Sequence, residues 1–107
     1  MKDIIQNCKG FEWDEGNSDK NWQLHRVADA ECEDVFFNVP LIIAADAKHS
    51  NRESRFYALG RTENNRRLFI AFTVRENLIR VISARDMTKS EQRKYAEKIK
   101  RDTDFSQ

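Results

Sequence analysis

The sequence predicts an α+β domain with two N-terminal helices, about four antiparallel strands forming one sheet, and a C-terminal helix. Three strand-like runs in the second half of the chain are separated by short asparagine-containing turns, which is typical of an antiparallel sheet. Helical patterns lie before and after these runs, so we expect helices packed on one face of the sheet. A chain of 107 residues suffices for one domain, and we expect 1–107 to form it, ordered from about residue 10 to 101.

Two short helices are predicted before residue 40. The first ends near Arg26, and Trp22 and His25 share one of its faces because they lie three residues apart. The second covers Asp29–Phe37, where apolar residues recur at helical spacing. The C-terminal helix begins after a T-x-x-E capping box at Thr88 and is expected to run to about residue 101.

Four strands are predicted between these helices. The first follows Pro40, which ends helical structure, and the remaining three follow one another through short turns. The predicted strands are Leu41–Ala45, Arg55–Arg61, Arg67–Arg75 and Leu78–Arg85.

The central strand, Arg67–Arg75, separates an apolar face from a mixed one. Its even-numbered residues are all apolar and must face the core, whereas its odd-numbered residues include arginine at both ends. A two-residue turn after this strand pairs Thr73 with Arg80, so Arg80 projects from the mixed face. By the same alternation Arg85 falls on the core side, and it reaches the mixed face only if the strand bends or bulges.

The strand Arg55–Arg61 admits two registers. A two-residue loop at Asn64-Asn65 turns its odd-numbered side chains toward the core, and a three-residue loop turns them toward the mixed face. The second register creates a basic and aromatic surface, and the sequence pattern leaves both registers open. That surface consists of Arg55, Tyr57, Arg61, Arg75 and Arg80.

Charge is distributed unevenly along the chain. Residues 1–47 hold four Lys/Arg and ten Asp/Glu, a net −6, whereas residues 48–101 hold fifteen Lys/Arg and six Asp/Glu, a net +9. A protein of net charge +1 can bind a polyanion through such a basic half. A solvated basic surface is the alternative interpretation.

Several classes of protein do not fit the sequence. No apolar run approaches the roughly 20 residues of a membrane-spanning helix, and no secretory signal is evident at the N-terminus. The two cysteines do not form a disulfide framework, so we expect reduced thiols and a cytoplasmic location. Cysteine and histidine lack metal-site spacing, and no glycine-rich phosphate loop occurs, so we expect no metal and no cofactor.

Four segments resemble the BrnT family of ribonuclease toxins from bacterial type II toxin–antitoxin pairs. They are FEWDEGNSDKNWQLHRV at Phe11–Val27, DVFFNVPL at Asp34–Leu41, RFYALGRT at Arg55–Thr62 and IRVISARDMTKSEQRKYAE at Ile79–Glu97. The last segment is the most specific. The family often has glycine after its histidine, where this chain has Arg26.

The resemblance implies a RelE-like fold whose antiparallel sheet carries an RNA site, and RNA cleavage without a metal. It also implies a BrnA-like antitoxin as partner, usually a ribbon-helix-helix protein, and operator DNA bound only through that antitoxin. The rival hypothesis is a catalytically decayed relative that only binds RNA or protein.

Metal-independent RNA cleavage needs a base for the 2′-hydroxyl, cations for the phosphorane and an acid for the 5′-oxygen. Arginine suits the second role because its planar fork matches phosphate oxygens and keeps its charge. We expect Arg80, Arg85 and Arg55 to supply it.

His25 and Glu53 are the candidates for proton transfer, and His25 matches a family position. His25 could instead be a helix-end residue, and Glu53 could be an ion partner of Arg55. The predicted RNA-binding residues are Arg61, Arg67, Arg75, Arg93 and Tyr95. Core packing is the competing interpretation for Tyr95.

Overall fold

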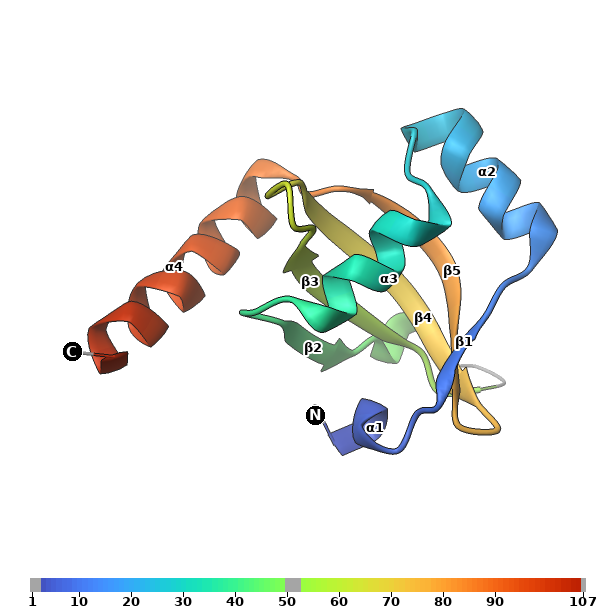
Figure 1. Cartoon of the computed structure of the whole chain (residues 1–107), viewed down its shortest axis with the longest axis horizontal. Helices are drawn as coiled ribbons and strands as arrows, with labels where there is room; N and C mark the ends of the chain where they lie inside the picture. Colours follow the sequence, from blue (N-terminus) through green and yellow to red (C-terminus); the bar gives the residue numbers. More distant parts are fainter. Residues whose placement is uncertain (1–2, 50–52, 107) are drawn as a thin grey trace.

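A mixed sheet of five strands in the spatial order β1-β5-β4-β3-β2 forms the centre of the fold. The computed structural model describes residues 3–49 and 53–106. β1 runs parallel to β5, and the other neighbouring strands are antiparallel (Figure 1). The elements are α1 (Asp3–Gln6), β1 (Gly10–Glu12), α2 (Glu15–His25), α3 (Asp29–Phe37), β2 (Ile42–Ala45), η1 (Ala47–His49), β3 (Phe56–Arg61), β4 (Arg67–Arg75), β5 (Leu78–Asp86) and α4 (Lys89–Ser106).

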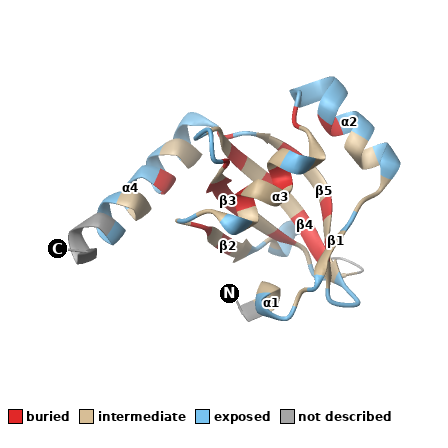
Figure 2. Ribbon diagram, viewed as in Figure 1, coloured by how far each residue is buried: buried red, intermediate tan, exposed pale blue. Residues whose placement is uncertain are grey.

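The main apolar core lies between α3 and the sheet. α3 crosses one face of the sheet, α2 lies along β5, and α4 extends away from the end of β5 (Figure 1). Buried residues lie on α3 and on the strands that it crosses (Figure 2). Cys32 and Val35 of α3 are buried in one cluster with Ile70 and Phe72 of β4, and the Phe36 ring meets Phe72 edge-on at 5.2 Å. The predicted α+β class is therefore confirmed. The expectation that the helices pack on one face of the sheet is wrong for α4, because Tyr95 and Ile99 of α4 pack against Leu59 on the other face.

Most predicted boundaries agree with the structure. α3 and β4 have the predicted bounds, and the other three predicted strands differ by one residue at one end. The capping box at the start of α4 is present, since Thr88 Oγ1 accepts from the Glu91 N–H at 3.2 Å and Glu91 Oε1 accepts from the Thr88 N–H at 2.9 Å. α4 runs five residues beyond the predicted end, to Ser106, because no glycine or proline interrupts it.

The sequence analysis missed α1 and the parallel edge strand β1. β1 has only three residues, Gly10–Glu12, which is too short to show an alternating pattern. Its register against Leu78–Arg80 comes from contacts distant in sequence, including the Lys9 N–H that donates to the Asn77 carbonyl at 2.8 Å. The sheet therefore has five strands rather than about four, and it is mixed rather than wholly antiparallel.

A three-residue loop joins β3 to β4 and decides the register that the sequence left open. The Thr62 N–H donates to the Arg66 carbonyl at 2.9 Å, and Asn65 adopts the left-handed conformation with φ 64°. Tyr57 consequently lies opposite Ala71 on the mixed face. The second of the two registers is the observed one.

A β-bulge in β5 changes the alternation of side chains along this strand. Phe72 pairs with Val81 and Ala71 pairs with Ser83, so Ile82 is the extra residue. Arg85 then pairs with Phe69 on the mixed face instead of falling on the core side. The turn before β5 pairs Thr73 with Arg80, as predicted. Both turn residues, Glu76 and Asn77, have positive φ.

The corner between α2 and α3 shows why glycine suits the position that Arg26 occupies in this chain. Arg26 ends α2 in the left-handed conformation with φ 53°, which glycine adopts without steric cost. Its N–H still donates to the Trp22 carbonyl at 2.9 Å. Ala28 offers no capping side chain to α3, and Glu31 Oε1 accepts from the Ala28 N–H at 3.0 Å instead.

Gly60 of β3 lies against Val35 of α3, with no room for a side chain. A methyl group added there would lie 2.6 Å from Val35 Cγ1 on a stiff β-branched side chain, and 3.3 Å from Leu41 Cδ1. We predict that Gly60→Ala lowers the free energy of unfolding by about 1–3 kcal/mol through overpacking. Urea denaturation measures this change.

Gly10→Ala is the matched control in the same sheet. The nearest atom to its added methyl, Leu78 Cδ2, lies 4.0 Å away, so we expect a change within about 0.5 kcal/mol. Equal stability of the two variants would contradict the packing described for α3.

Candidate functional site

The sheet face that α3 does not cover carries most of the predicted site residues, and we call it the arginine face. α4 covers the part of this face next to β3, where Tyr95 and Ile99 pack against Leu59. The arginine face comprises Arg55, Tyr57, Leu59, Arg61, Arg67, Phe69, Ala71, Thr73, Arg75, Arg80, Ser83 and Arg85.

Three arginines gather around Glu53 at one end of the arginine face. Arg75 Nη2 donates to Glu53 Oε2 at 2.9 Å. This hydrogen bond lowers the pKa of Glu53, and the charges of Arg75, Arg55 and Arg80 lower it further against the opposing effect of desolvation. Glu53 is therefore ionised at neutral pH, and Glu53, Arg55 and Arg80, three of the predicted catalytic residues, lie within electrostatic reach of one another. We call Arg55, Arg75 and Arg80 the first arginine group.

A buried hydroxyl group fixes the segment that carries Glu53 and Arg55. Thr73 of β4 is 1% exposed, and its Oγ1 donates to the Ser54 carbonyl at 2.7 Å. Because Thr73 also pairs with Arg80, it connects the two strands that supply the cations.

Carboxylates at the β1 end pair with Arg80. Arg80 Nη2 donates to Asp14 Oδ2 at 3.3 Å, and Arg80 Nη1 lies 3.7 Å from Glu12 Oε1. Asp14 is also the N-cap of α2, accepting from the Asn17 N–H at 2.9 Å. A phosphate bound by Arg80 would therefore have to replace or share these carboxylates.

Arg85 belongs to a second group at the other end of the arginine face. Its guanidinium donates to both carboxylate oxygens of Glu91, at 2.8 and 3.0 Å, and lies 4.2 Å above the Phe69 ring. The strand partners of Arg80 and Arg85 are four residues apart on β4, or about 13 Å along the strand. The predicted arginines thus share a face but form two groups.

The other predicted RNA-binding arginines differ in their surroundings. Arg67 lies 5.4 Å from the centre of the Tyr95 ring and donates to Gln92 at 3.4 Å, while Arg61 donates to the Val39 carbonyl at 3.0 Å. Arg93 is exposed on α4. It lies two residues from buried Tyr95, about 200° around the helix, so it faces away from the sheet.

Tyr95 is a packing residue in this structure. Its side chain is 0% exposed, and its hydroxyl donates to the Pro40 carbonyl at 2.6 Å. The prediction that Tyr95 binds RNA does not fit such burial. The competing interpretation from the sequence, packing against the sheet, describes its position.

His25 lies apart from Glu53 and Arg80. It ends α2 with an exposed side chain, and its carbonyl accepts from Arg66 Nη2 at 3.0 Å. Its charge acts on Asp86, at the opposite end of β5 from Arg80. The structure therefore does not bring His25 together with the first arginine group.

Arg66 joins this corner, and the sequence analysis did not single it out. Its guanidinium donates to Asp86 at 2.8 Å, to Glu31 at 3.1 Å and to the Arg26 carbonyl at 2.7 Å. These bonds raise the pKa of Arg66 and lower that of Asp86. No local pattern separates Arg66 from Arg67 beside it, because its partners come from three distant segments.

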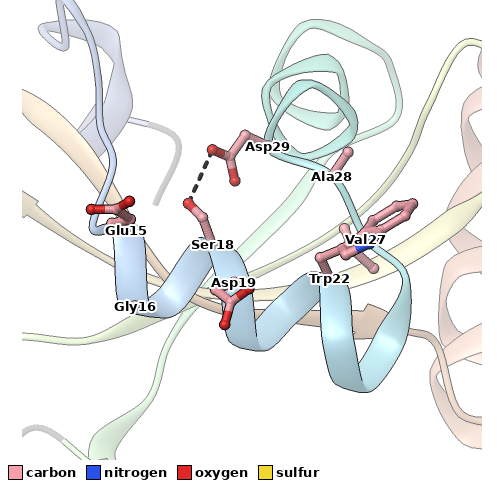
Figure 3. A pocket seen from close by; sticks show the side chains of 8 residues that line it. All are labelled: Glu15, Gly16, Ser18, Asp19, Trp22, Val27, Ala28 and Asp29. Atoms are coloured by element: carbon pink, nitrogen blue, oxygen red, sulfur yellow. Dashed lines mark hydrogen bonds between the residues drawn. The ribbon is translucent and has the colours of Figure 1, made fainter.

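A cavity away from the arginine face lies between α2 and α3 (Figure 3). Its volume is about 620 Å³, and Ser18 donates to Asp29 at 3.0 Å across it. Its carboxylates disfavour a phosphate ligand. The lining residues are Glu15, Gly16, Ser18, Asp19, Trp22, Val27, Ala28 and Asp29.

Residues 13–91 match the family model described as the ribonuclease toxin, BrnT, of type II toxin–antitoxin systems. The chain belongs to the BrnT family. The match runs from the start of α2 into the first turn of α4, so it includes the whole arginine face. No curated protein matches the chain. Among the residues that the structure describes, no helix of this BrnT protein is long and apolar enough to cross a membrane.

The Arg66 cluster makes a pH-dependent contribution to stability. Asp86 has a lowered pKa when folded, so its contribution is present above its unfolded pKa near 4 and is lost as the pH falls through the folded pKa. We predict that Arg66→Ala costs about 1–3 kcal/mol of unfolding free energy at pH 7. Chemical denaturation at several pH values measures the cost.

Arg66→Lys is the matched variant, because it keeps the charge but loses the planar fork, and we expect an intermediate cost. The difference between wild type and Arg66→Ala should shrink below pH 4. A difference that stays constant from pH 7 to pH 3 would contradict the assigned role of Asp86.

Proposed function

We propose that this BrnT protein is an endoribonuclease that cleaves RNA without a metal ion, and that the first arginine group is its cleavage centre. The observation that carries the proposal is the gathering of Arg55, Arg75 and Arg80 around the ionised carboxylate of Glu53. Of the three groups that the reaction needs, this cluster supplies the base and the cations that stabilise the phosphorane.

In this proposal Glu53 takes the proton of the attacking 2′-hydroxyl. The 2′-oxygen then bonds to phosphorus, the bond to the 5′-oxygen breaks as that oxygen takes a proton from water, and a 2′,3′-cyclic phosphate remains. Arg80 and Arg75 stabilise the added charge on the phosphorane, since guanidinium groups donate two parallel hydrogen bonds to phosphate oxygens. Arg55 contributes positive charge from the neighbouring strand.

The second arginine group binds the RNA backbone beside the cleavage centre. Arg85 and Arg67 lie about 13 Å along the sheet from Arg80, which suits a neighbouring phosphate better than the scissile one. His25 has no part in this centre, because it lies near Asp86 at the far end of β5.

A non-catalytic binding module is the second candidate function. The pairing of Arg80 with Asp14 and of Arg85 with Glu91 favours it, because these carboxylates neutralise guanidinium charge that would otherwise stabilise the phosphorane. Such a protein would bind RNA in a salt-dependent way without cutting it.

The partner in this proposal is a protein antitoxin, which a type II system implies. Electrostatic complementarity favours an acidic antitoxin segment that covers the arginine face and excludes RNA. We further propose that this antitoxin is BrnA-like with a ribbon-helix-helix domain, that operator DNA is bound only through it, and that both proteins act in the cytoplasm.

We predict that Arg80→Ala lowers RNA cleavage in EDTA by about 100-fold or more, because one donor to the phosphorane is lost. Gel analysis of RNA and detection of new 2′,3′-cyclic phosphate ends measure cleavage. The thermal midpoint should change by only a few degrees, because a partly exposed ion pair contributes little stability.

Lys20→Ala is the charge-matched control on exposed α2, and its cleavage rate should equal that of the wild type. RNA binding by the wild type without any scission would support the binding module and refute the nuclease.

A further inference from the structure

Two aromatic rings stand between the two arginine groups. Tyr57 and Phe69 are stacked with ring centres 5.5 Å apart and an interplanar angle of 19°. Arg85 lies 4.2 Å from the centre of the Phe69 ring, and Lys94 Nζ lies 5.6 Å from that of Tyr57. Arg85, Phe69 and Tyr57 thus form a stack of cation, ring and ring on the arginine face, and Lys94 lies at the hydroxyl edge of Tyr57.

The two ends of this stack are held differently. Arg85 is fixed by two hydrogen bonds to Glu91, which the capping box of α4 holds in turn. Lys94 is exposed, and it donates one hydrogen bond, to the Tyr57 hydroxyl at 3.2 Å. Displacing Lys94 costs far less than displacing Arg85, so the Tyr57 ring is the end at which a ligand can enter the stack.

Tyr57 is half-buried, because one side of it packs against the cluster of Leu59, Met87 and Tyr95 under α4, and its neighbours across the strands are small. Its cross-strand partners on the two sides are Ala44 and Ala71, and Ser83 lies one strand further. These small side chains rise little above the sheet, whereas the Tyr57 ring is supported from behind by Phe69.

We propose that the Tyr57 ring, supported by Phe69 and Arg85, is the stacking site for one unpaired nucleobase of single-stranded RNA. The proposal rests on the proposed function in taking RNA as the ligand. Every base has a flat π-face, and base–aromatic stacking between positively charged groups is a general mode of single-strand recognition. Lys94, released from the ring, then pairs with the phosphate next to the stacked base.

The stack separates the cleavage centre from the second arginine group. Tyr57 lies one row along the sheet from the Arg55 and Arg80 row, and Phe69 shares the next row with Arg85. An RNA strand whose phosphates contact both arginine groups has to cross the row of Tyr57, Ala71 and Ser83. The site fixes which nucleotide lies beside the scissile bond without reading its hydrogen-bonding edge.

The test is binding of a short single-stranded RNA with 2′-O-methyl groups throughout, which cannot be cleaved, measured by fluorescence anisotropy. Tyr57→Leu should weaken binding about 5- to 150-fold, the range for losing one base–aromatic stack. Tyr57→Phe, which keeps the ring but loses the bond to Lys94, should bind within about twofold of wild type.

Two controls separate stacking from damage to the fold. Phe37→Leu removes an aromatic ring that is 79% exposed on α3, and it should bind RNA as the wild type does. An oligonucleotide of abasic sites should bind wild type and Tyr57→Leu equally, because no base remains to stack.

Failure of this proposal is distinguishable from failure of the proposed function. Wild-type affinity in Tyr57→Leu, or an equal loss on the abasic oligonucleotide, overturns the stacking site even if Arg80→Ala abolishes cleavage. Loss of affinity in Tyr57→Leu with rescue by Tyr57→Phe upholds the stacking site even if the protein never cuts RNA.

Discussion

The β-bulge at Ile82 is the constraint on which the arginine face depends. Arg80 and Arg85 are five residues apart, and in a regular strand an odd separation would place them on opposite faces of the sheet. The bulge restores both to one face, and α2 holds the bulged segment in position. Asn21, which is 2% exposed, accepts from the Ala84 N–H at 3.2 Å, and Asn17 donates to the Val81 carbonyl at 3.5 Å.

The two faces of the sheet divide the charge of the chain between them. The acidic first half forms α2 and α3 on one side, and the basic second half supplies the strands whose arginines point to the other. Carboxylates nevertheless reach the arginine face at Asp14, Glu53 and Glu91 and pair with its arginines. These ion pairs occupy the guanidinium groups in the free protein. An RNA phosphate that binds there has to displace the carboxylates or share the guanidinium donors with them.

The sequence predicted what depends on local chemistry. The helix Asp29–Phe37, the pairing of Thr73 with Arg80 and the capping box of α4 all follow from short-range patterns, and the structure agrees with each. The sequence could not choose the register of β3, because Asn64-Asn65 fits a loop of either length. The bulge, β1 and the Arg66 cluster have no local signal at all. Residue types alone identified a basic face, but they did not reveal that its arginines form two groups or that His25 lies elsewhere.

The central claim is that RNA binds to the arginine face, and NMR of the arginine Nε–H groups tests it most directly. We would titrate the labelled protein with the non-cleavable single-stranded RNA and follow each side-chain signal after assignment by single substitutions. The account predicts that the signals of Arg75, Arg80 and Arg85 shift, while those of Arg26 and Arg66 on the helical side do not. Shifts confined to Arg26 and Arg66, with the arginine face unchanged at saturating RNA, would contradict it.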